Sequence, residues 1–275
     1  MMRSTTRRTA MLGSALLFAS AQVKAASERR LERQALRPTF ADDFSAFAAS
    51  ASGLIGPRPV WRTTFIGGDR TLPNNREVQW YQDHGPDGPF KTDAQGLIIE
   101  AGPADGLRQG LTHRSGLITS QRIFAQRYGY FEIRARLSQG RGLWPAFWLL
   151  PSDGTWPPEI DVMEYLGHEP RTYYTAVHAR PNGIALDEVT AIPSPDLSAG
   201  FHNFGVGWRP DRISYFLDEV TVHETQTPAD MHKQMYLLAN LAVGGAGSWP
   251  GPASAGQRGT MRIAWIKGWQ FIDLA

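Results

Sequence analysis

Three carboxylates spaced E-x-D-x-x-E are the feature that most constrains how this chain can fold. Glu159, Asp161 and Glu164 stand in the segment EIDVME, where every residue between them is apolar. Successive side chains of a β-strand point to opposite faces, so Glu159 and Asp161 share one face. Strict alternation would give the next position on that face to Met163. A β-bulge adds one residue to a strand, so a bulge near Val162 or Met163 would return Glu164 to the acidic face.

The length of such a bulged strand predicts how far apart the two outer acids lie. About four strand steps separate Glu159 from Glu164, which places their Cα atoms roughly 13 Å apart. Each side chain reaches inward by roughly 4 Å, so the carboxyl groups would lie about 5 Å apart, as in a retaining glycosidase. Three carboxyl groups this close cannot all ionise independently. We therefore expect Glu159 to be the ionised nucleophile, Glu164 the acid and later base, and Asp161 a hydrogen-bond partner that orients Glu159.

Tryptophans accompany the acids in the same stretch of sequence. Sugar rings present apolar faces to aromatic side chains, so tryptophan beside paired carboxylates suits a saccharide cleft. We expect Trp144 and Trp156 to line the cleft and Trp148, which stands between Phe147 and Leu149, to lie in the core. The alternative, a solvated acidic strand edge, leaves the apolar spacers and the tryptophans unexplained.

The chain resembles glycoside hydrolase family 16, the laminarinase, lichenase and agarase group. The E-x-D-x-x-E form is similar to the bulged branch of the laminarinases and differs from the E-x-D-x-E form of lichenases. The resemblance implies an all-β fold, a two-sheet β-jelly-roll sandwich with a concave substrate cleft, and a retaining mechanism. It also implies for the three acids the roles that the strand argument gives them. The matching segments run in the family's order: 115–137, 142–151, 159–164, 201–220, 237–251 and 261–270.

Length and composition fit one large β domain. The 275 residues suffice for a single sandwich, and 28 glycines and 19 prolines suit many short strands joined by turns. The chain has no cysteine, which excludes disulfides and thiolate metal sites. We expect residues 40–275 to form one catalytic domain that acts as a monomer.

The first residues have the features of an export signal. In residues 1–25, three arginines precede an apolar run that is too short to span a membrane. The pair Arg7-Arg8 suggests the twin-arginine route, with an ordinary Sec signal as the alternative. Residues 26–39 are charged and suggest a leader segment. We therefore expect a secreted or periplasmic protein with no membrane association in its mature form.

Removal of the signal would change the net charge and its interpretation. The segment holds four basic residues and no acidic ones, so the 28 basic and 26 acidic residues become 24 and 26, a net charge of −2. No basic stripe in the sequence indicates a nucleic-acid partner. The expected partner is a polysaccharide substrate.

Residues 60–82 hold further candidate sugar contacts. Turn residues are followed there by a strand-like alternation of polar and apolar residues. The segment resembles the part of family laminarinases that borders the minus subsites, which makes Arg70, Asn75 and Glu77 candidate contacts. A solvent-exposed strand face is the alternative. The form GGDRTLPNN also resembles bacterial relatives that cleave exopolysaccharides.

Single polar or aromatic residues on later segments complete the candidate site. His178 lies on a predicted strand that, by the resemblance, runs beside the catalytic one, so it is a candidate contact of the leaving group or partner of Glu164. A metal ligand is not expected there, because no second ligand stands at suitable spacing. Asn240 is either a satisfied core amide or a cleft contact, and Trp249 is a candidate sugar platform at the minus end.

Other patterns predict supporting structure. Asp42 and Asp43 could hold a calcium ion, as in some family members, but Asp also favours turns, so we expect no cofactor. The charges that alternate with apolar residues in 129–137 predict a solvated face. Residues 227–235 suggest one or two helical turns, and residues 261–271 suggest a strand that closes the sheet.

The sequence as a whole predicts a secreted, endo-acting, retaining β-glycanase that hydrolyses internal β-1,3 or β-1,4 glucosyl linkages. One alternative is a depolymerase of a succinoglycan-type exopolysaccharide, or a transglycosylase, on the same scaffold. Another is a non-catalytic, lectin-like carbohydrate-binding module, which would need the cleft but not the acids. We expect the choice of glycan to depend on loops 102–113, 180–200 and 244–258.

Overall fold

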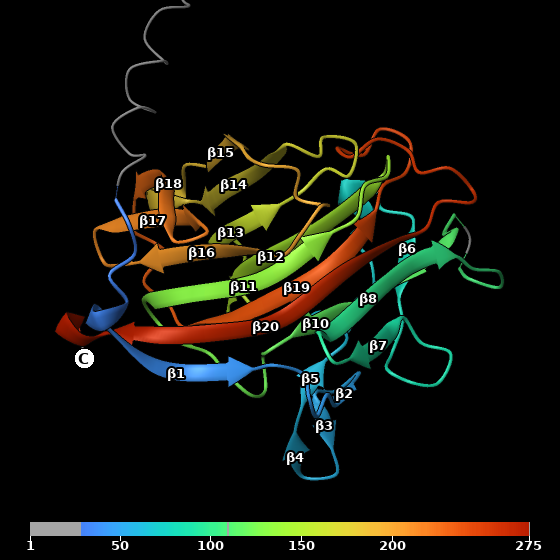
Figure 1. Cartoon of the computed structure of the whole chain (residues 1–275), viewed down its shortest axis with the longest axis horizontal. Coiled ribbons are helices and arrows are strands. Elements are labelled where there is room, and N and C mark those ends of the chain that lie inside the picture. The colour runs from blue at the N-terminus through green and yellow to red at the C-terminus, as the bar shows by residue number, and fades with distance from the viewer. Residues whose placement is uncertain (1–28, 109, 275) are drawn as a thin grey trace, which may run out of the picture.

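Two β-sheets pack face to face around the main apolar core, with a small hairpin beside them (Figure 1). The structure, a computed structural model, describes residues 29–108 and 110–274. The predicted export signal at residues 1–25 lies outside these ranges. No helix in the described chain is long and apolar enough to cross a membrane. The architecture confirms the predicted all-β, two-sheet jelly-roll sandwich.

The larger sheet has ten strands, with β11 and β20 near its centre. These long strands run side by side across Figure 1 and pair from Tyr130 opposite Trp269 to Leu137 opposite Met261. This central place corrects the expectation that β20 closes the sheet. In spatial order the strands are β18 (Val220–Gln226), β17 (Arg212–Leu217), β16 (His202–Trp208), β11 (Gly129–Leu137), β20 (Gly259–Phe271), β8 (Gly96–Pro103), β9 (His113–Ser115) and β6 (Gln79–Tyr81), while β1 (Leu36–Asp42) pairs with β20 and β7 (Phe90–Asp93) pairs with β8.

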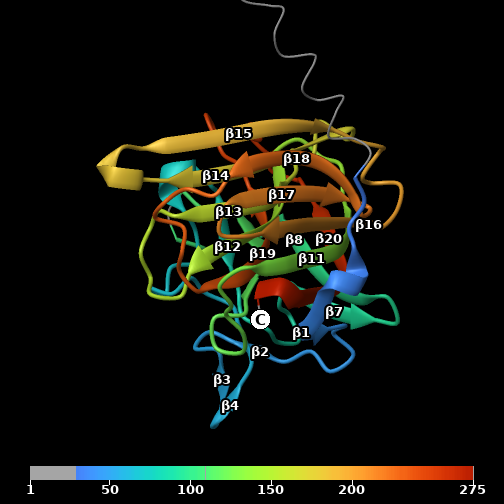
Figure 2. The same ribbon diagram turned by 90° about the vertical axis from the view of Figure 1, so that its left-hand side faces the viewer.

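The smaller sheet has eight strands and holds the acidic strand β13 between β12 and β14. Figure 2 shows β15, β14, β13 and β12 one below another. The edge strand β15 occupies part of residues 180–200, which we expected to be a loop. In spatial order the strands are β15 (Leu186–Pro193), β14 (Thr172–Ala179), β13 (Glu159–Glu164), β12 (Leu143–Pro151), β19 (Met235–Val243), β10 (Leu117–Thr119), β5 (Trp61–Arg62) and β2 (Ala49–Ser50).

Short elements complete the described chain. The hairpin pairs β3 (Leu54–Ile55) with β4 (Arg58–Pro59). Residues 227–234 form irregular turns before β19 and no helix, which corrects the helical turns predicted for 227–235. Four single 3₁₀ turns are η1 (Arg33–Ala35), η2 (Pro73–Asn75), η3 (Pro181–Gly183) and η4 (Ile272–Leu274).

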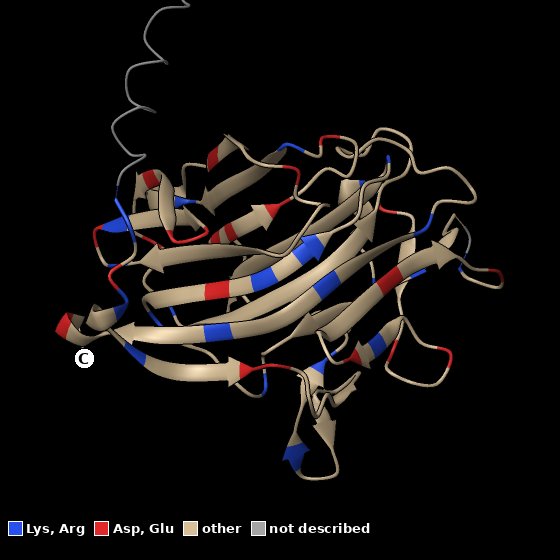
Figure 3. Cartoon of the chain, viewed as in Figure 1, with Lys and Arg blue, Asp and Glu red and all other residues tan. Residues whose placement is uncertain are grey.

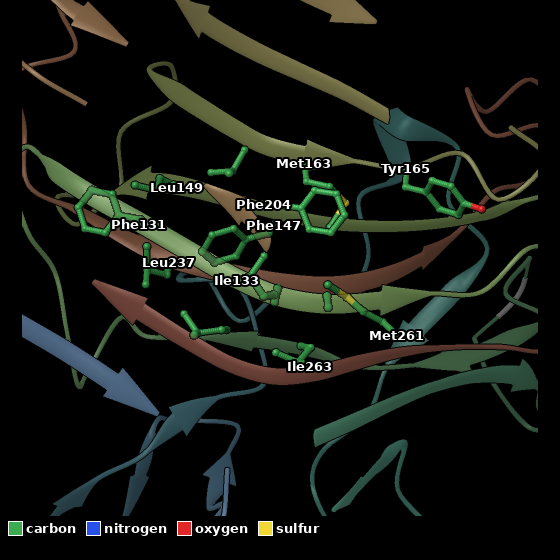
Figure 4. Packing of buried hydrophobic residues seen from close by; sticks show 14 of the residues in the cluster. Phe131, Ile133, Phe147, Leu149, Met163, Tyr165, Phe204, Leu237, Met261 and Ile263 are labelled. Carbon is green, nitrogen blue, oxygen red and sulfur yellow. The ribbon is translucent and has the colours of Figure 1, made fainter. Parts of the chain in front are cut away.

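Strand alternation divides the smaller sheet into a core face and an outer face. Phe147 and Leu149 of β12 are fully buried in the same cluster as Phe131 and Ile133 of β11, as Figure 4 shows. Burial of each such side chain stabilises the fold by about 1.5–3 kcal/mol. The intervening residues of β12 point away from the core and line a cavity on the outer face: Trp144, Ala146, Trp148 and Leu150.

The predicted bulge lies in β13. On one side Phe147 pairs with Met163 while the next residue, Trp148, pairs with Asp161, so Val162 is an extra residue. Both Val162 and Met163 belong to the main core cluster. Figure 4 shows Met163 there beside the core phenylalanines. The two apolar neighbours thus fill the core together, and Glu164 returns to the outer face.

The N-terminal segment is part of the domain. Residues 36–38, within the predicted leader, pair with 269–271 of β20, so the predicted boundary at residue 40 cuts through β1. Ahead of β1, Arg33 reaches the outer face of the larger sheet and donates two hydrogen bonds to Glu132 at 3.0 and 2.9 Å. Tyr130 donates a third at 2.6 Å. Glu132 is fully buried under this cover, which corrects the expectation of a solvated charged face at that position.

Replacing Arg33 with alanine should lower the free energy of unfolding by about 1–3 kcal/mol, because the buried Glu132 carboxylate would lose two of its three hydrogen bonds. Equilibrium unfolding in urea measures the loss. Arg37→Ala is the control, since Arg37 is exposed and donates to Gln270, and its effect should stay within about 0.5 kcal/mol. Equal losses in both variants would contradict the role given to Arg33.

Candidate active site

A cavity of about 930 Å³ lies over the outer face of the smaller sheet. Its floor comes from strands β12, β13, β14 and β19, and its walls come from residues 65–77 and 151–156. Carboxylates and aromatic rings dominate the lining, and among the described residues no Lys or Arg contributes to it. The volume is in the range of ligand-binding clefts.

The three acids of β13 all line this cavity. Each outer acid accepts a hydrogen bond from an indole: Trp156 Nε1 donates to Glu159 Oε2 at 2.6 Å, and Trp144 Nε1 donates to Glu164 Oε1 at 3.2 Å. Glu164 is 9% exposed, whereas Glu159 keeps more of its surface open to the cavity. The same bulge that fills the core therefore places both outer carboxyl groups in one cleft, each held by a different tryptophan.

Asp161 lies between them and is the most enclosed of the three, at 3% exposed. Its Oδ2 atom is buried and has no hydrogen-bond partner among the described residues. The closest cationic or basic group is His178, whose Nε2 lies 3.5 Å from Asp161 Oδ2. The other ring nitrogen, Nδ1, is 2.7 Å from Asp187 Oδ1 on β15. Asp187 accepts the Nδ1 proton in this geometry, which turns Nε2 toward the acids.

Burial raises the pKa of all three carboxyl groups, and the charges around each group make the three pKa values differ. Burial, then the charges of Glu159 and Glu164, hold the pKa of Asp161 well above its usual range. Burial and the charge of Glu159 raise the pKa of Glu164 to about 8. Burial also raises the pKa of Glu159, but the charge of His178, the Trp156 hydrogen bond and a hydrogen bond from Asp161 oppose the rise. The cluster loses its first proton most readily at Glu159.

His178 differs from its prediction in two ways. It faces Asp161 and Asp187, and no described contact joins it to Glu164, its predicted partner. Second, other potential metal ligands do lie near it in three dimensions, although none stands at suitable spacing in the sequence. Oxygen atoms of Glu159 and Asp161 and a ring nitrogen of His178 lie within 4.8 Å of one another, a donor set that a divalent cation could use.

The candidate contacts from residues 60–82 separate into two groups. Asn75 and Glu77 line the cavity, and Glu77 accepts hydrogen bonds from Leu72 N, Asn75 Nδ2 and Gln79 Nε2. Glu77 thus fixes the loop that carries Asn75. Arg70 does not line the cavity, because its guanidinium pairs with Asp83 at 2.8 Å and donates to Tyr81 O.

The remaining candidates all reach the cavity. Asn240 is buried and held in place, since it accepts from Trp148 Nε1 at 2.7 Å and donates one N–H to Tyr81 Oη at 2.9 Å. Trp148 was expected in the core, but it lies on the cavity side in a separate apolar cluster with Phe65. Trp249 is 42% exposed and stands over the cleft.

Two aromatic platforms border the acids. Trp156, 61% exposed, stands at Glu159. Near Glu164, the Trp249 ring meets the Trp144 ring edge-on at 5.5 Å and the Tyr174 ring at 4.7 Å. A bound chain would therefore meet an exposed apolar ring on each side of the carboxylates.

Sequence reasoning missed several cavity residues. Tyr174 was detectable, because it shares a strand face with His178 at a spacing of four. Phe65 and Tyr236 had no such signal, since they resemble ordinary core aromatics. Asp187 could not be found without knowing that β15 exists and pairs Asp187 with His178.

Such a site can divide acid and nucleophile roles between like groups. One carboxyl with a strongly raised pKa can donate a proton at neutral pH, while another with a lower pKa attacks as an anion. The intervening Asp161 can pass a hydrogen bond to the attacking group. The arrangement suits cleavage of a glycosidic bond held across β13.

Comparison with known proteins gives consistent matches. The family model of glycosyl hydrolases family 16 matches residues 77–267. Two relatives from Rhizobium meliloti (strain 1021), the endo-1,3-1,4-beta-glycanases EglC and ExsH, are 39% and 38% identical over 250 and 249 residues. Each alignment covers 86% of this chain and 52% of the relative, so the chain spans about half the length of these relatives.

Solved structures show the same architecture. The laminarinase catalytic domain from Thermotoga maritima MSB8 matches with a TM-score of 0.69 and 26% identity, over 86% of this chain and 98% of that one. The endo-beta-1,3-glucanase from Pyrococcus furiosus matches with a TM-score of 0.69 and 27% identity, over 86% of this chain and 95% of that one.

The raised pKa of Glu164 predicts a pH-dependent cost in stability. Its folded pKa of about 8 exceeds the ordinary value of 4.5, so the folded state holds a proton that the unfolded state releases between these limits. Stability should therefore fall as pH rises from about 5 to 8. Glu164→Gln removes this dependence and should stabilise the protein by on the order of a few kcal/mol at pH 8 but little at pH 5.

Urea unfolding of wild type and Glu164→Gln at both pH values measures this difference. Glu32→Gln, which changes an exposed carboxyl, is the control and should show no such pH-dependent gain. A gain from Glu164→Gln that is the same at pH 5 and pH 8 would refute the raised pKa.

Proposed function

The chain belongs to glycoside hydrolase family 16, and on that premise we propose that it is an endo-acting, retaining β-glycanase. It hydrolyses internal β-1,3 or β-1,4 glucosyl linkages of a polysaccharide. The single observation that carries this proposal is the set of three carboxylates on one face of β13, inside an aromatic-lined cavity.

The proposed reaction has two steps. In the first, Glu164 gives its proton to the glycosidic oxygen while Glu159 attacks the anomeric carbon, which forms a glycosyl-enzyme ester and releases the leaving sugar. In the second, Glu164 as a carboxylate takes a proton from water, and the water oxygen displaces Glu159. Asp161 keeps its proton, because its pKa is held well above the usual range, and donates a hydrogen bond to Glu159. His178, held by Asp187, opposes the rise in the pKa of Glu159.

The lining of the cavity supports a neutral glycan at the cleavage point. Among the described residues, five acids and no Lys or Arg line the cavity, so an anionic sugar there would meet repulsion without a compensating cation. Exposed Trp156 and Trp249 offer apolar faces to neutral rings. The printed names of EglC and ExsH, endo-1,3-1,4-beta-glycanases, support the two linkage types. The features of residues 1–25 support action outside the cytoplasm, and we propose a monomer that needs no cofactor.

A second candidate is cleavage of a bacterial exopolysaccharide by the same chemistry. The segment GGDRTLPNN, on which that resemblance depends, forms one wall of the cavity: Gly67, Asp69, Leu72, Pro73, Asn74 and Asn75 all line it. Transglycosylation would also use the same intermediate, and it differs only in the acceptor that attacks.

A product assay on a polysaccharide panel tests the proposed function. The panel holds laminarin, mixed-linkage β-glucan, agarose and a succinoglycan-type exopolysaccharide. We expect oligosaccharides from laminarin or mixed-linkage β-glucan, and a fall in kcat of at least about 10³-fold in Glu159→Ala. Glu188→Ala is the control, because Glu188 lies on β15 outside the cavity and bonds Thr225.

Each other outcome has a distinct meaning. Cleavage of the exopolysaccharide alone would favour the second candidate, and products longer than the donor would indicate transglycosylation. Binding without cleavage of any glycan, or full activity in Glu159→Ala, would overturn the proposed mechanism.

The stereochemistry of the first product tests the double displacement separately. Proton NMR of a fresh digest should show the β-anomer first, because two inversions at the anomeric carbon retain configuration. An α-anomer formed first would require a single displacement by water, which contradicts a glycosyl-enzyme on Glu159.

A further inference from the structure

A second hollow, of about 480 Å³, lies on the outer face of the larger sheet, where β7, β8, β9 and the start of β20 meet. It is lined by residues of that sheet and of the segments next to its strands, whereas the cleft lies on the other sheet, across the core. Its charged lining consists of Lys91, Arg114 and Arg258 with a single acid, Glu100. This balance is the reverse of that in the cleft.

Both arginines of the hollow lie next to one glycine, Gly102. Arg114 pairs across strands with Gly102. A side chain added at Gly102 would place its Cβ 3.0 Å from Arg258 Nη1, so Arg258 occupies the space that the glycine leaves open. Two cationic residues thus border the Gly102 position of the hollow, and both would attract an anion bound there.

The positive charge continues across the sheet beyond the hollow. Lys91 of β7 pairs with Ile98 of β8, Ile98 with Arg262 of β20, and Arg262 with Arg136 of β11. Directly paired residues point to the same face of a sheet, so these three cations stand in one row. In Figure 3 blue bands mark β7, β20 and β11. Arg136 and Arg262 stand directly opposite each other, where like charges are destabilising.

Only part of this charge is balanced within the protein. Lys91 pairs with Glu100 at 2.8 Å and Arg262 with Asp93 at 2.9 Å. Within residues 29–108 and 110–274, Arg114, Arg136 and Arg258 have no carboxylate within 4 Å. Arg114 donates to the Asp87 carbonyl oxygen, and Arg136 stacks on Phe201. The three arginines keep guanidinium groups available for an external anion.

The residues around the hollow suit a carbohydrate that bears the anionic group. The hydroxyl group of Thr260 lines the hollow and can bond a sugar hydroxyl, whereas the Ser138 hydroxyl donates to Thr260 O at 2.6 Å. Beside the row, Phe201 offers an apolar ring under Arg134 and Arg136. Guanidinium groups form paired hydrogen bonds with carboxylates, which favours a sugar acid.

We propose that this hollow and the adjoining arginine row bind a carboxylate-bearing polysaccharide, at a site separate from the cleft. The positive charge indicates a binding site for an anion. The choice of a polysaccharide as the molecule that bears the anion rests on the proposed function. The site holds acidic polymer on the side of the protein away from the catalytic strand. Cleavage and acidic-chain binding are then carried by different sheets.

Direct binding to polygalacturonate tests the proposal without relying on hydrolysis. Its α-linked galacturonic acid chain carries the anionic groups but is not a β-glucan. Affinity electrophoresis should show retardation of the wild type by polygalacturonate at low salt, with no comparable retardation by neutral dextran. Retardation should vanish near about 1 M NaCl, where charges are screened beyond about 3 Å.

A triple variant, Arg114→Ala with Arg136→Ala and Arg258→Ala, should bind polygalacturonate at least about tenfold more weakly, which corresponds to 1.4 kcal/mol. The matched control is Arg58→Ala with Arg122→Ala and Arg171→Ala, which removes the same charge from exposed arginines elsewhere. It should bind within about twofold of wild type, since its losses lie outside the hollow and the row.

Four results would overturn the proposal: no retardation of the wild type, an equal loss in both triple variants, binding that persists in high salt, or tighter binding of a single-stranded DNA of matched charge. The proposed function is tested independently of these results, because hydrolysis of laminarin or mixed-linkage glucan by the triple variant reports on the cleft alone. Hydrolysis with no polyanion binding would reject only the second site.

Discussion

All three carboxylates of β13 can share one face only because the strand carries an extra residue, Val162, that has no partner on β12. A regular strand would have sent Glu164 into the core and Met163 into the cleft. The extra residue lets Val162 and Met163 both enter the core cluster, where they are 1% and 0% exposed. The packing gain of two buried apolar side chains and the alignment of three acids thus come from the same local irregularity. Bulges recur beside active sites because they redirect a side chain without breaking the sheet.

Placing three acids together is unfavourable for folding and useful for chemistry. Burial raises the pKa of each group, repulsion raises it further at Asp161 and Glu164, and the surroundings of Glu159 oppose the rise there. Trp156 and His178 favour the anion at Glu159, while Glu164 has the weaker indole contact at 3.2 Å and a pKa of about 8. Charge is also divided on the scale of the whole molecule. The acids gather in the cleft of one sheet, and cations without carboxylate partners gather on the outer face of the other.

Local periodicity in the sequence predicted part of the site, although it also led to two wrong expectations, Trp148 in the core and helical turns at 227–235. The strand alternation around EIDVME placed the bulge, and the tryptophans of the same stretch marked the cleft. It failed where contacts between distant segments decide the outcome. Glu132 looked solvated because nothing local reveals that Arg33, 99 residues away, would cover it. Asp187 was invisible because its role depends on the pairing of β15 with β14. Arg70 looked available, although Asp83 holds it away from the cavity. The basic row has no counterpart in the linear sequence, since its members come from three strands that the sheet brings together.

In the proposed mechanism Glu159, and neither of its acidic neighbours, forms the bond to the sugar. The most direct measurement is mass spectrometry of the protein after reaction with a 2-deoxy-2-fluoro β-glucosyl donor, whose intermediate hydrolyses slowly. We expect one added glycosyl group per protein, located by fragmentation on Glu159. We also expect no label in Glu159→Gln. A label on Glu164 or Asp161 would contradict the assignment of roles, and turnover of the natural substrate without any trapped ester would contradict the covalent mechanism.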